Sequence, residues 1–479
     1  MLFNSLEFLI FLPLVFSGYW LCNRNLKLQN LLVVIVSYIF YGWWDWRFLI
    51  LIAFTSGWSF IFGLLPRSKW NVAISLIINL GILTVFKYYN FFVDSFISTL
   101  STISTILNLP NFQISHTFQT LNIILPVGIS FYTFQALSYT LDVYRGTIKP
   151  TKDPIAFFAF ISFFPQLVAG PIERATNLLP QFMKPRHFDY PLAVEGCRQM
   201  LWGFFKKIVI ADSCAIASNA MLNFSNPSSV SLWVGMLLFT FQIYGDFSGY
   251  SDIAIGCSKL FGIRLMRNFA HPYFARDIAE FWRRWHISLT TWFRDYLYIP
   301  LGGSRCGTLK KIRNTFAIFL VSGLWHGANW TFIFWGAFHA LCFLPLLLRG
   351  KNRKYVSDVV AEGRLLPSVG ELLQMAFTFF VVVIGWTFFR APDIASTFTW
   401  LGKMLTFSDL RTAQTCLSWL KVNVIAALFI FVVIEWFNRS RDIPWLPKSR
   451  WCRWLVYYIV TFTIFYWDSA QQSFIYFQF

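Results

Sequence analysis

The sequence predicts an all-α integral membrane protein that crosses the bilayer many times. Hydrophobic residues make up 56% of the 479 residues and charged residues only 13%, whereas about 25% of residues are charged in a typical soluble domain. Apolar runs of about 20 residues recur from one end of the chain to the other, and this length of helix crosses roughly 30 Å of hydrocarbon. Together these observations exclude a water-soluble fold.

We expect membrane helices at each apolar run. The runs cover residues 6–21, 31–46, 48–65, 72–93, 121–141, 203–222, 230–262, 370–389, 423–437 and 454–467, with a longer stretch at 314–348. The first run is expected to remain in the protein, because no basic residue precedes it and no small-residue cleavage site follows it. With no internal repeat, the chain is expected to form one domain over 1–479. Its motif-dense core lies at 125–345, and the peripheral helices lie at 1–120 and 370–479.

The net charge of +18 comes from Lys and Arg in short loops rather than on one soluble face. This pattern indicates membrane lipid and phosphate-bearing cytosolic ligands as partners, and it argues against nucleic acid. The eight Cys show no CxxC pair and no Cys/His spacing typical of zinc. We therefore expect neither a metal site nor a disulfide framework.

The Lys and Arg bias also predicts orientation. The loops at 349–369 and 438–453 are rich in basic residues and should be cytoplasmic. One span, 454–467, separates the second loop from the tail that begins at Asp468. Both this tail and Met1–Asn4, neither of which contains Lys or Arg, should therefore lie outside the cytoplasm.

Two apolar stretches should not cross the bilayer once. The run 155–170 lies between basic segments and contains Pro165 and the Gly170-Pro171 pair, so we expect it to enter and leave on one side. A single helix over 314–348 would be roughly 50 Å long, too long for one crossing. It should fold into a hairpin, with the bend at Gly323–Asn329 and His326 near the tip.

His326 is the first candidate for catalysis. An ionisable side chain at bilayer depth costs several kcal/mol unless a partner or a water-filled cavity compensates it. A neutral imidazole can take a proton from an attacking hydroxyl as a general base. The alternative is a structural histidine bonded to a backbone carbonyl. Trp325 and Asn329 flank His326 and are expected to line or support the same cavity.

A second cluster extends from Glu280 to Asp295. Its aromatic and aliphatic residues recur at a spacing of three to four, which predicts one helix in the membrane interface. In the structural interpretation this helix only anchors the protein at the membrane surface. In the functional one, His286 points into the core, and three arginines face the phosphates of an acyl donor: Arg283, Arg284 and Arg294.

A third cluster interrupts the apolar run 230–262 with carboxylates and hydroxyls. Polar groups this dense seldom face lipid, so they either line a cavity or form a buried hydrogen-bond network. The residues are Asp246, Ser248, Tyr250, Ser251 and Asp252. His339 is expected to be structural. His116, His187 and His271 fall in polar or basic loops, and no chemistry is predicted for them.

Three stretches resemble the signature of the membrane-bound O-acyltransferase family, and most closely its alginate O-acetylation branch. They read DFSGYSD at 246–252, FWRRWHISLTTWFRD at 281–295 and LWHGANW at 324–330. Supporting stretches lie at 125–146, 169–173, 384–391 and 474–479, so the resemblance covers essentially the whole chain. His326 matches the family's near-invariant histidine, and His286 matches the second histidine of this bacterial branch.

The resemblance implies a ring of roughly 11 tilted helices around a central tunnel, with re-entrant and interfacial helices, in a bacterial inner membrane. It implies acetyl transfer from a cytosolic thioester, expected to be acetyl-CoA, to an extracytoplasmic polysaccharide such as alginate, with no permanently bound cofactor. A separate extracytoplasmic acetyltransferase is the expected protein partner. We hypothesise that His326 activates the attacking hydroxyl, and that Tyr476, in an uncharged aromatic segment of the tail, accepts and relays the acyl group. The alternative for Tyr476 is an aromatic anchor at the interface.

Other functions remain open at this stage. Peptidoglycan O-acetylation and D-alanyl transfer to teichoic acid use the same chemistry within the family. A transporter or flippase would also place His, Asp and Arg inside the membrane, although such proteins usually show symmetric halves. A scaffold that only recruits an extracytoplasmic transferase would not need His326.

Overall fold

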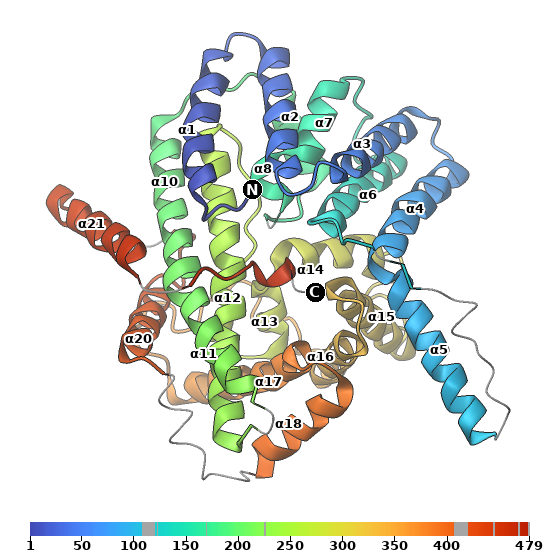
Figure 1. Cartoon of the computed structure of the whole chain (residues 1–479), viewed down its shortest axis with the longest axis vertical. Coiled ribbons are helices and arrows are strands. Elements are labelled where there is room, and N and C mark those ends of the chain that lie inside the picture. The colour runs from blue at the N-terminus through green and yellow to red at the C-terminus, as the bar shows by residue number, and fades with distance from the viewer. Residues whose placement is uncertain are drawn as a thin grey trace.

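The computed structural model describes residues 1–107, 120–121, 123–168, 170–224, 227–406, 420–443, 446–467 and 470–477 (Figure 1). Every regular element within these ranges is helical, so the predicted all-α fold is confirmed. His116, Ala169, Asp468, Gln478 and Phe479, all of which belong to segments considered above, lie outside the described residues.

The helices fall into three consecutive groups. The N-terminal group comprises α1 (Leu6–Leu21), α2 (Leu26–Gly42), α3 (Phe48–Leu64), α4 (Lys69–Leu83), α5 (Tyr89–Ile106), α6 (Ile129–Arg145), α7 (Pro154–Ser162), α8 (Phe164–Leu167) and α9 (Ala175–Phe182). The middle group comprises α10 (Tyr190–Phe204), α11 (Asp212–Leu222), α12 (Ser229–Leu260), α13 (Ile278–Arg284), α14 (Ile287–Phe293), α15 (Thr308–His326) and α16 (Trp330–Leu348). The C-terminal group comprises α17 (Val369–Arg390), α18 (Ile394–Thr406), α20 (Val422–Phe437) and α21 (Arg450–Tyr466).

Several helices have the length and apolar composition of membrane spans. Among the described residues these are Lys69–Ile106, α12, α16 and α17, and α1, α2, α3 and α20 are shorter apolar helices. The first of these spans joins α4 to α5 through a π-helical turn at Thr84–Tyr88. The span expected at 121–141 begins later, at Ile129, and the sequence pattern had not indicated α18.

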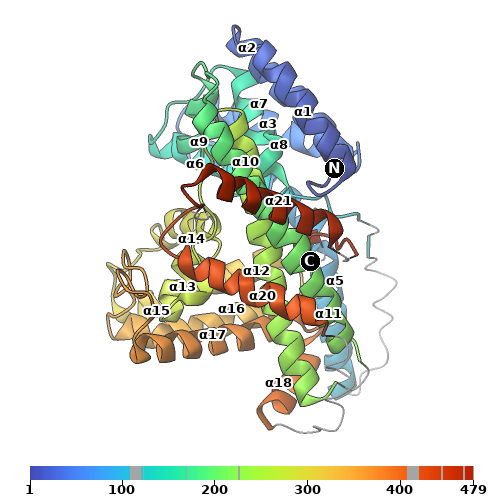
Figure 2. The same ribbon diagram turned by 90° about the vertical axis from the view of Figure 1, so that its left-hand side faces the viewer.

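α12 is the central element of the fold. It packs against α10, α11, α17 and α18, and 72% of its most apolar window is buried. α20 and α21 cross the outside of this group (Figure 2). Residues 470–477 run across α12 into the middle of the molecule, where the described chain ends (Figure 1). This path brings a terminal segment into the centre of the helices.

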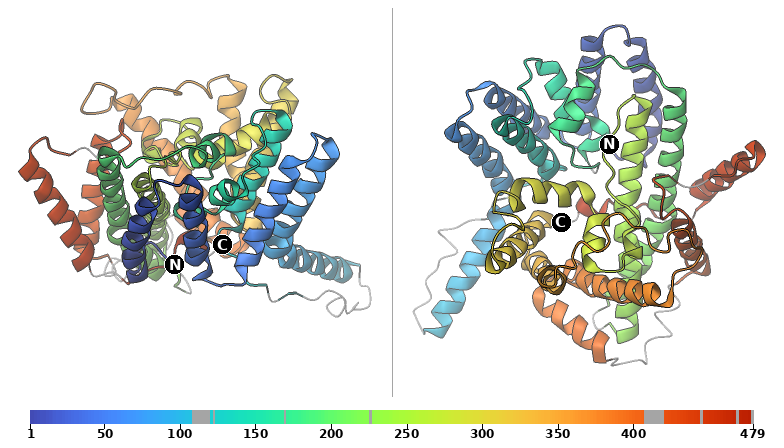
Figure 3. Two further views of the ribbon diagram at one scale, coloured as in Figure 1. Left: turned by 90° about the horizontal axis from the view of Figure 1, so that it is seen from above. Right: turned by 180° about the vertical axis from the view of Figure 1, so that it is seen from behind.

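The two chain ends lie toward the same face of the molecule. The connection between α16 and α17, which contains the basic residues of loop 349–369, lies at the opposite face (Figure 3). A long hydrogen bond of 3.5 Å joins the two ends, in which the side-chain amide of Gln471 donates to the carbonyl of Asn4. The termini and this basic loop thus lie on opposite faces, and which face is cytoplasmic stays a prediction from the Lys and Arg bias.

The predicted hairpin at 314–348 is present as α15 and α16. α15 ends at His326, and Asn329 begins α16 by accepting a hydrogen bond from the backbone N–H of Thr331. Gly323 lies inside α15 rather than in the bend. A Cβ there would come within 2.1 Å of the Phe332 carbonyl, and one at Gly336 within 2.2 Å of the Phe319 carbonyl. The two glycines therefore allow the backbones of the hairpin to touch.

The prediction of one interfacial helix over 280–295 is wrong. The segment forms two short helices, α13 and α14, which are separated at Trp285 and His286. His286 has φ 44° and ψ 55°, in the left-handed region that breaks a right-handed helix. The break turns α14 away from α13 and directs the His286 side chain inward, where it is 1% exposed.

The run 155–170 is also broken, as predicted. α7 ends at Ser162, and α8 begins directly after Phe163 with Pro165 in its first turn. The freed backbone N–H of Phe164 donates to the hydroxyl of Ser37. Protein atoms thus satisfy the break, as an irregular segment at membrane depth requires.

Candidate active site

His326 occupies the last position of α15, at the tip of the hairpin. Its side chain is 3% exposed, and aromatic rings surround it. Ring centroids lie 5.0 Å away for Trp325 and Trp335, and 5.4 Å away for Phe389. The Nδ1 atom has no hydrogen-bond partner among the described residues. Nδ1 therefore does not make the bond to a backbone carbonyl that is typical of a structural histidine.

His286 is the second imidazole of the site, with its ring centroid 6.5 Å from that of His326. Its backbone conformation costs of order 1–3 kcal/mol and persists only where the surroundings impose it. Asn268 imposes it on both sides: its carbonyl accepts from the N–H of Ile287 at 2.9 Å, and its side-chain oxygen contacts Nδ1 of His286 at 2.9 Å.

The contacts of Asn268 fix the protonation of His286. The backbone N–H of Ser288 donates to the same Asn268 side-chain oxygen, while the side-chain amide donates to the hydroxyl of Ser251. A backbone N–H can only donate, so the Asn268 atom facing His286 is the oxygen, and Nδ1 of neutral His286 must carry the hydrogen. Nε2 is then unprotonated, and it has no partner among the described residues.

Tyr476 lies beside His326 and shares the neighbour Phe247 with His286. The centroid of its ring is 5.6 Å from that of His326 and 6.3 Å from that of Trp325. Phe247 of α12 contacts it at 4.6 Å and also contacts His286 at 4.7 Å. The tail residue and the two motif histidines therefore form one cluster, although more than 140 residues of sequence separate His326 from Tyr476.

Buried charges hold the tail in place. Lys207 pairs with Asp212 at 2.7 Å and with Asp246 at 2.9 Å, and each of the three side chains is at most 3% exposed. Lys207 also donates to the carbonyl of Gln472, and Asp246 accepts from the backbone N–H of Ile475 at 2.7 Å. We call Lys207, Asp212 and Asp246 the tail clamp. Because it grips main-chain atoms, it fixes the register of the residues that precede Tyr476.

Two cavities meet the histidine cluster. The first, called here the histidine cavity, has a volume of about 60 Å³, and both His286 and His326 line it, together with Ser322 of α15. The second, called the tail cavity, has a volume of about 70 Å³ and is lined by Tyr476, Trp325 and Lys87. The histidine cavity thus borders both imidazoles, and the tail cavity borders the Tyr476 ring.

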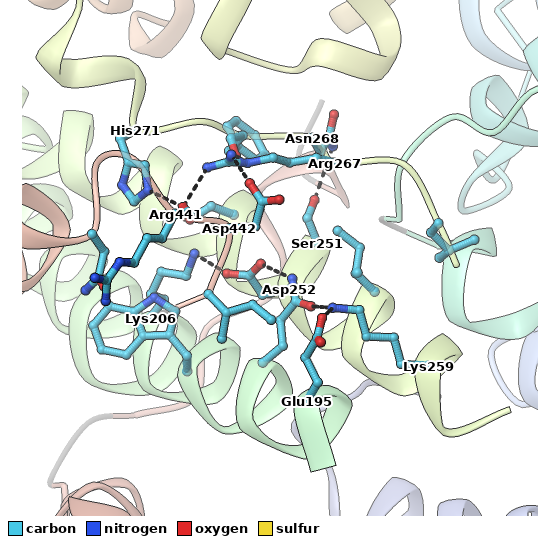
Figure 4. A pocket seen from close by; sticks show the side chains of 18 of the residues that line it. Glu195, Lys206, Ser251, Asp252, Lys259, Arg267, Asn268, His271, Arg441 and Asp442 are labelled. Atoms are coloured by element: carbon cyan, nitrogen blue, oxygen red, sulfur yellow. Dashed lines mark hydrogen bonds and ion pairs between the residues drawn. The ribbon is translucent and has the colours of Figure 1, made fainter. Parts of the chain in front are cut away.

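A larger polar cavity of about 210 Å³ lies between α10, α12 and the segments around residues 264–271 and 441 (Figure 4). Ser248, Ser251 and Asp252 line it, as expected for the third motif. Lys206 pairs with Asp252, and Lys259 pairs with Glu195. Ser251 and Asn268 connect this cavity to His286 by hydrogen bonds.

The remaining candidates have other partners. Arg283 donates to the carbonyls of Asn352 and Tyr355, and Arg284 donates to Glu280 and two carbonyls. Arg294 pairs with Asp295, and its side chain is 59% exposed. Arg283 and Arg284 thus fix the connection to α17, and only Arg294 of the three faces outward.

Three residues singled out from the sequence remain: Tyr250, Asn329 and His339. The hydroxyl of Tyr250 donates to Asn4, so Tyr250 supports the N-terminus instead of a cavity. Besides its backbone cap, Asn329 donates to the carbonyl of Pro392. His339 packs against Trp282 and Trp335, away from Tyr476. Within the described ranges, no group of three His, Cys, Asp or Glu side chains could hold a metal ion.

Sequence reasoning missed four features of the site: Lys87, Asn268, Lys207 and the His271–Glu435 pair. Glu435 accepts from Nδ1 of His271 at 2.8 Å and from the hydroxyl of Tyr244 at 2.5 Å. The signal was present for two of them, because Lys87 and Glu435 are isolated charges inside apolar runs. His271 was assigned no chemistry from its loop position, and its burial beside the polar cavity was not foreseen.

Comparison with known proteins identifies the family. The family model for membrane-bound O-acyltransferases matches residues 151–355. A probable alginate O-acetylase of Pseudomonas putida is 40% identical, over 92% of this chain and 88% of its own length. The chain belongs to the membrane-bound O-acyltransferase family. A peptidoglycan O-acetyltransferase of Helicobacter pylori is 30% identical over all of this chain and 98% of its own length.

This membrane-bound O-acyltransferase is therefore an enzyme with several helices that span the membrane. A teichoic acid D-alanyltransferase of Bacillus subtilis is 30% identical over 56% of the chain. His286 and His326 fall inside the stretch that matches the family model, whereas Lys87 and Tyr476 fall outside it. The structure brings all four residues to the same cluster and its cavities.

Proposed function

We propose that this acyltransferase moves an acetyl group from a cytosolic thioester, acetyl-CoA, to hydroxyls of an extracytoplasmic polysaccharide. Relatives named as alginate O-acetylases at about 40% identity over more than 90% of the chain support a polysaccharide acceptor. Alginate or a similar exopolysaccharide is the acceptor that these names favour. The proposal includes an extracytoplasmic acetyltransferase as partner, which completes transfer to the polymer.

His326 is the proposed general base. The observation that carries this role is that His326 lines the histidine cavity, with its ring 5.6 Å from that of Tyr476, which lines the tail cavity. A general base works within about 2.6–3.2 Å of the proton it removes, and such contacts often tighten only when substrate binds. His286, whose Nε2 lacks a hydrogen and a partner, is the second acceptor available to the site.

Tyr476 is the proposed carrier of the acyl group. Its hydroxyl oxygen attacks the thioester carbonyl, His326 takes the hydroxyl proton, and the carbon–sulfur bond breaks as the phenyl ester forms. The departing thiolate then receives the proton and leaves as a thiol. An acceptor hydroxyl next attacks the ester and regenerates the phenol. No hydrogen bond of the Tyr476 hydroxyl to a described residue competes with this role.

The donor is proposed to enter through the histidine cavity from the cytosolic face. The basic loop opposite the two termini supports this orientation, with both termini outside the cytoplasm. Arg294 is the exposed member of the three motif arginines and is proposed to contact donor phosphates. Arg283 and Arg284 act instead through the backbone carbonyls that they hold.

The proposal is tested by deleting the protein and measuring O-acetyl groups on each envelope polymer. Complementation with the intact protein should restore the lost acetyl groups, whereas complementation with His326→Ala should not. His339→Gln is the matched control, since it changes a buried histidine that lies away from Tyr476. Restoration by His326→Ala would refute catalysis at this site and favour the scaffold role.

Peptidoglycan O-acetylation is the second candidate, because the Helicobacter pylori relative aligns over nearly its full length. In the same deletion strain, loss of acetyl groups from peptidoglycan alone would select this candidate. D-alanyl transfer to teichoic acid is favoured less, since that similarity covers only 56% of the chain. A transporter or flippase role has no support from these relatives.

A further inference from the structure

An α-helix ends with its last four backbone carbonyls lacking partners inside the helix, and at the end of α15 three of these carbonyls are bonded to other side chains. The three carbonyls belong to Leu324, Trp325 and His326. Side chains from a different part of the chain satisfy all three. The Lys87 ammonium donates to Trp325 at 2.7 Å and to His326 at 3.1 Å, and the Tyr88 hydroxyl donates to Leu324 at 2.9 Å.

A local irregularity brings these two side chains to the site. α4 and α5 join through the π-helical turn Thr84–Tyr88, at the end of which Tyr88 adopts φ −118°. Such a turn accommodates an extra residue in a helix and is frequent at functional sites. The turn directs the consecutive residues Lys87 and Tyr88 toward α15, across about 240 residues of sequence.

Placing the Lys87 ammonium in a membrane span costs free energy that a purely structural contact does not require. It is the only Lys or Arg between Lys69 and Ile106 in a candidate membrane span, and an ammonium there carries a penalty of several kcal/mol. Among the described residues it has no carboxylate partner. The compensation comes from carbonyl dipoles at a helix C-terminus, where a cation is favourable. A neutral donor would satisfy the same carbonyls at lower cost.

The ammonium also faces the reacting groups. Lys87 lines the tail cavity together with Trp325 and Tyr476, and its Nζ lies 5.8 Å from the centre of the Trp325 ring. An ammonium has three hydrogens, and the two carbonyls take two of them. The residue thus contacts the backbone of His326 while bordering the space that Tyr476 also borders.

We propose that Lys87 is a positioning residue for acyl transfer. It holds the carbonyl end of α15, and through it the His326 ring, in the orientation that reaches the nucleophile. The inference rests on the proposed role of His326 as the base. Misplacement of a catalytic group by about 1 Å can lower a rate about 100-fold. Loss of Lys87 should therefore lower kcat rather than donor binding.

The test uses the full-length protein in lipid nanodiscs with acetyl-CoA and measures thiol release. Lys87→Met should lower kcat about 100-fold and leave KM for acetyl-CoA within about twofold, because the donor cavity is untouched. Lys87→Arg keeps the charge and the donors, and it should retain at least tenfold more activity than Lys87→Met. Tyr88→Phe, which removes only the neutral bond to Leu324, should lower kcat less than fivefold.

The control is Lys403→Met, which removes a lysine that donates to the carbonyl of Pro227 far from the site. It should leave kcat unchanged, so general loss of a lysine–carbonyl contact is excluded. Melting temperatures of all variants are measured in parallel. If Lys87→Met does not fold, Lys87→Arg and Tyr88→Phe still test the role: both should have a lower kcat than the intact protein, and equal kcat in all three proteins would overturn the proposal.

The two proposals fail in different ways. Full kcat in Lys87→Met, while His326→Ala is inactive, would overturn only the positioning role. Thiol release that persists in His326→Ala would overturn the proposed function itself. A rise in KM with unchanged kcat in Lys87→Met would also overturn the inference, because it would make Lys87 a donor-binding residue.

Discussion

The side-chain oxygen of Asn268 lies 2.9 Å from Nδ1 of His286, and this contact decides which ring nitrogen carries the hydrogen. Asn268→Ala removes the acceptor and frees the imidazole to adopt the other tautomer. We expect acetyl transfer to fall roughly 10- to 100-fold, part of the contribution of an acid–base group. Asn268→Asp keeps an acceptor for Nδ1 and should be less impaired. Ser251→Ala, which leaves the Asn268 oxygen in place, is the control, and equal activity in all variants would contradict the assignment.

His326→Gln should lower thiol release from acetyl-CoA about 10²- to 10⁴-fold, because it removes the base but nearly preserves side-chain volume. The measurement is the single-turnover rate in nanodiscs at saturating donor. Because the substitution leaves the Trp325 and Lys87 contacts intact, the melting temperature should change little. An active His326→Gln protein would show that another group takes the proton.

Tyr476→Phe tests the acyl carrier with the loss of one oxygen atom. Mixing the intact protein with isotopically labelled acetyl-CoA should yield an acetylated C-terminal peptide by mass spectrometry, and the Phe variant should yield none. Transfer to acceptor should fall to background in the variant. If transfer remains at the level of the intact protein, Tyr476 is an aromatic anchor and not a carrier.

The tail clamp predicts that the terminal segment detaches when its buried charges are unbalanced. Asp246→Asn weakens the contacts to Lys207 and to the Ile475 N–H, and breaking a buried pair typically costs about 3–5 kcal/mol. A cysteine placed at Ile475, which is 0% exposed, should become reactive to a membrane-impermeant maleimide in a background without the native cysteines. Glu195→Gln, which changes the partly exposed pair with Lys259, should leave the cysteine protected. Equal protection in both variants would show that the ring contacts alone hold the tail.

The glycines between α15 and α16 give a prediction about stability. Gly336→Ala places a methyl group 2.2 Å from the Phe319 carbonyl, and such overpacking typically costs about 1–3 kcal/mol. The melting temperature of the purified protein should fall. Gly81→Ala, where a Cβ meets nothing within 4 Å, should leave it unchanged or raise it. Similar melting temperatures for the two variants would mean that α15 and α16 can move apart without loss of stability.

The hairpin was predictable because helix length and bilayer thickness leave one solution for an apolar stretch of about 35 residues. The inward position of His326 followed from that geometry. The break at His286 was not predictable, because an aromatic stripe at helical spacing continues through it. A histidine in the sequence also does not indicate a positive φ, as a glycine would. Only the contacts of Asn268, brought in from another segment, impose that conformation.

The contacts across long sequence distances were also beyond the sequence pattern. Motif residues such as Asp246 could be recognised as functional or structural, but their partner was the backbone of Ile475, 229 residues away. Lys87 shows a different limit. A lone cation in an apolar run is a visible signal, yet nothing in the pattern indicates that its partners are the carbonyls at the end of α15.

At the π-helical turn Thr84–Tyr88, the direction in which Lys87 points depends on the number of residues in the turn. It depends less on the identity of most of those residues. Removing one residue would restore a regular α-helix and rotate everything on one side of the turn by about 100°. Lys87 would then point away from α15, or the whole of α5 would swing around its axis. Insertions and deletions in residues 84–88 should therefore be far less tolerated than substitutions at Thr84, Val85 or Phe86.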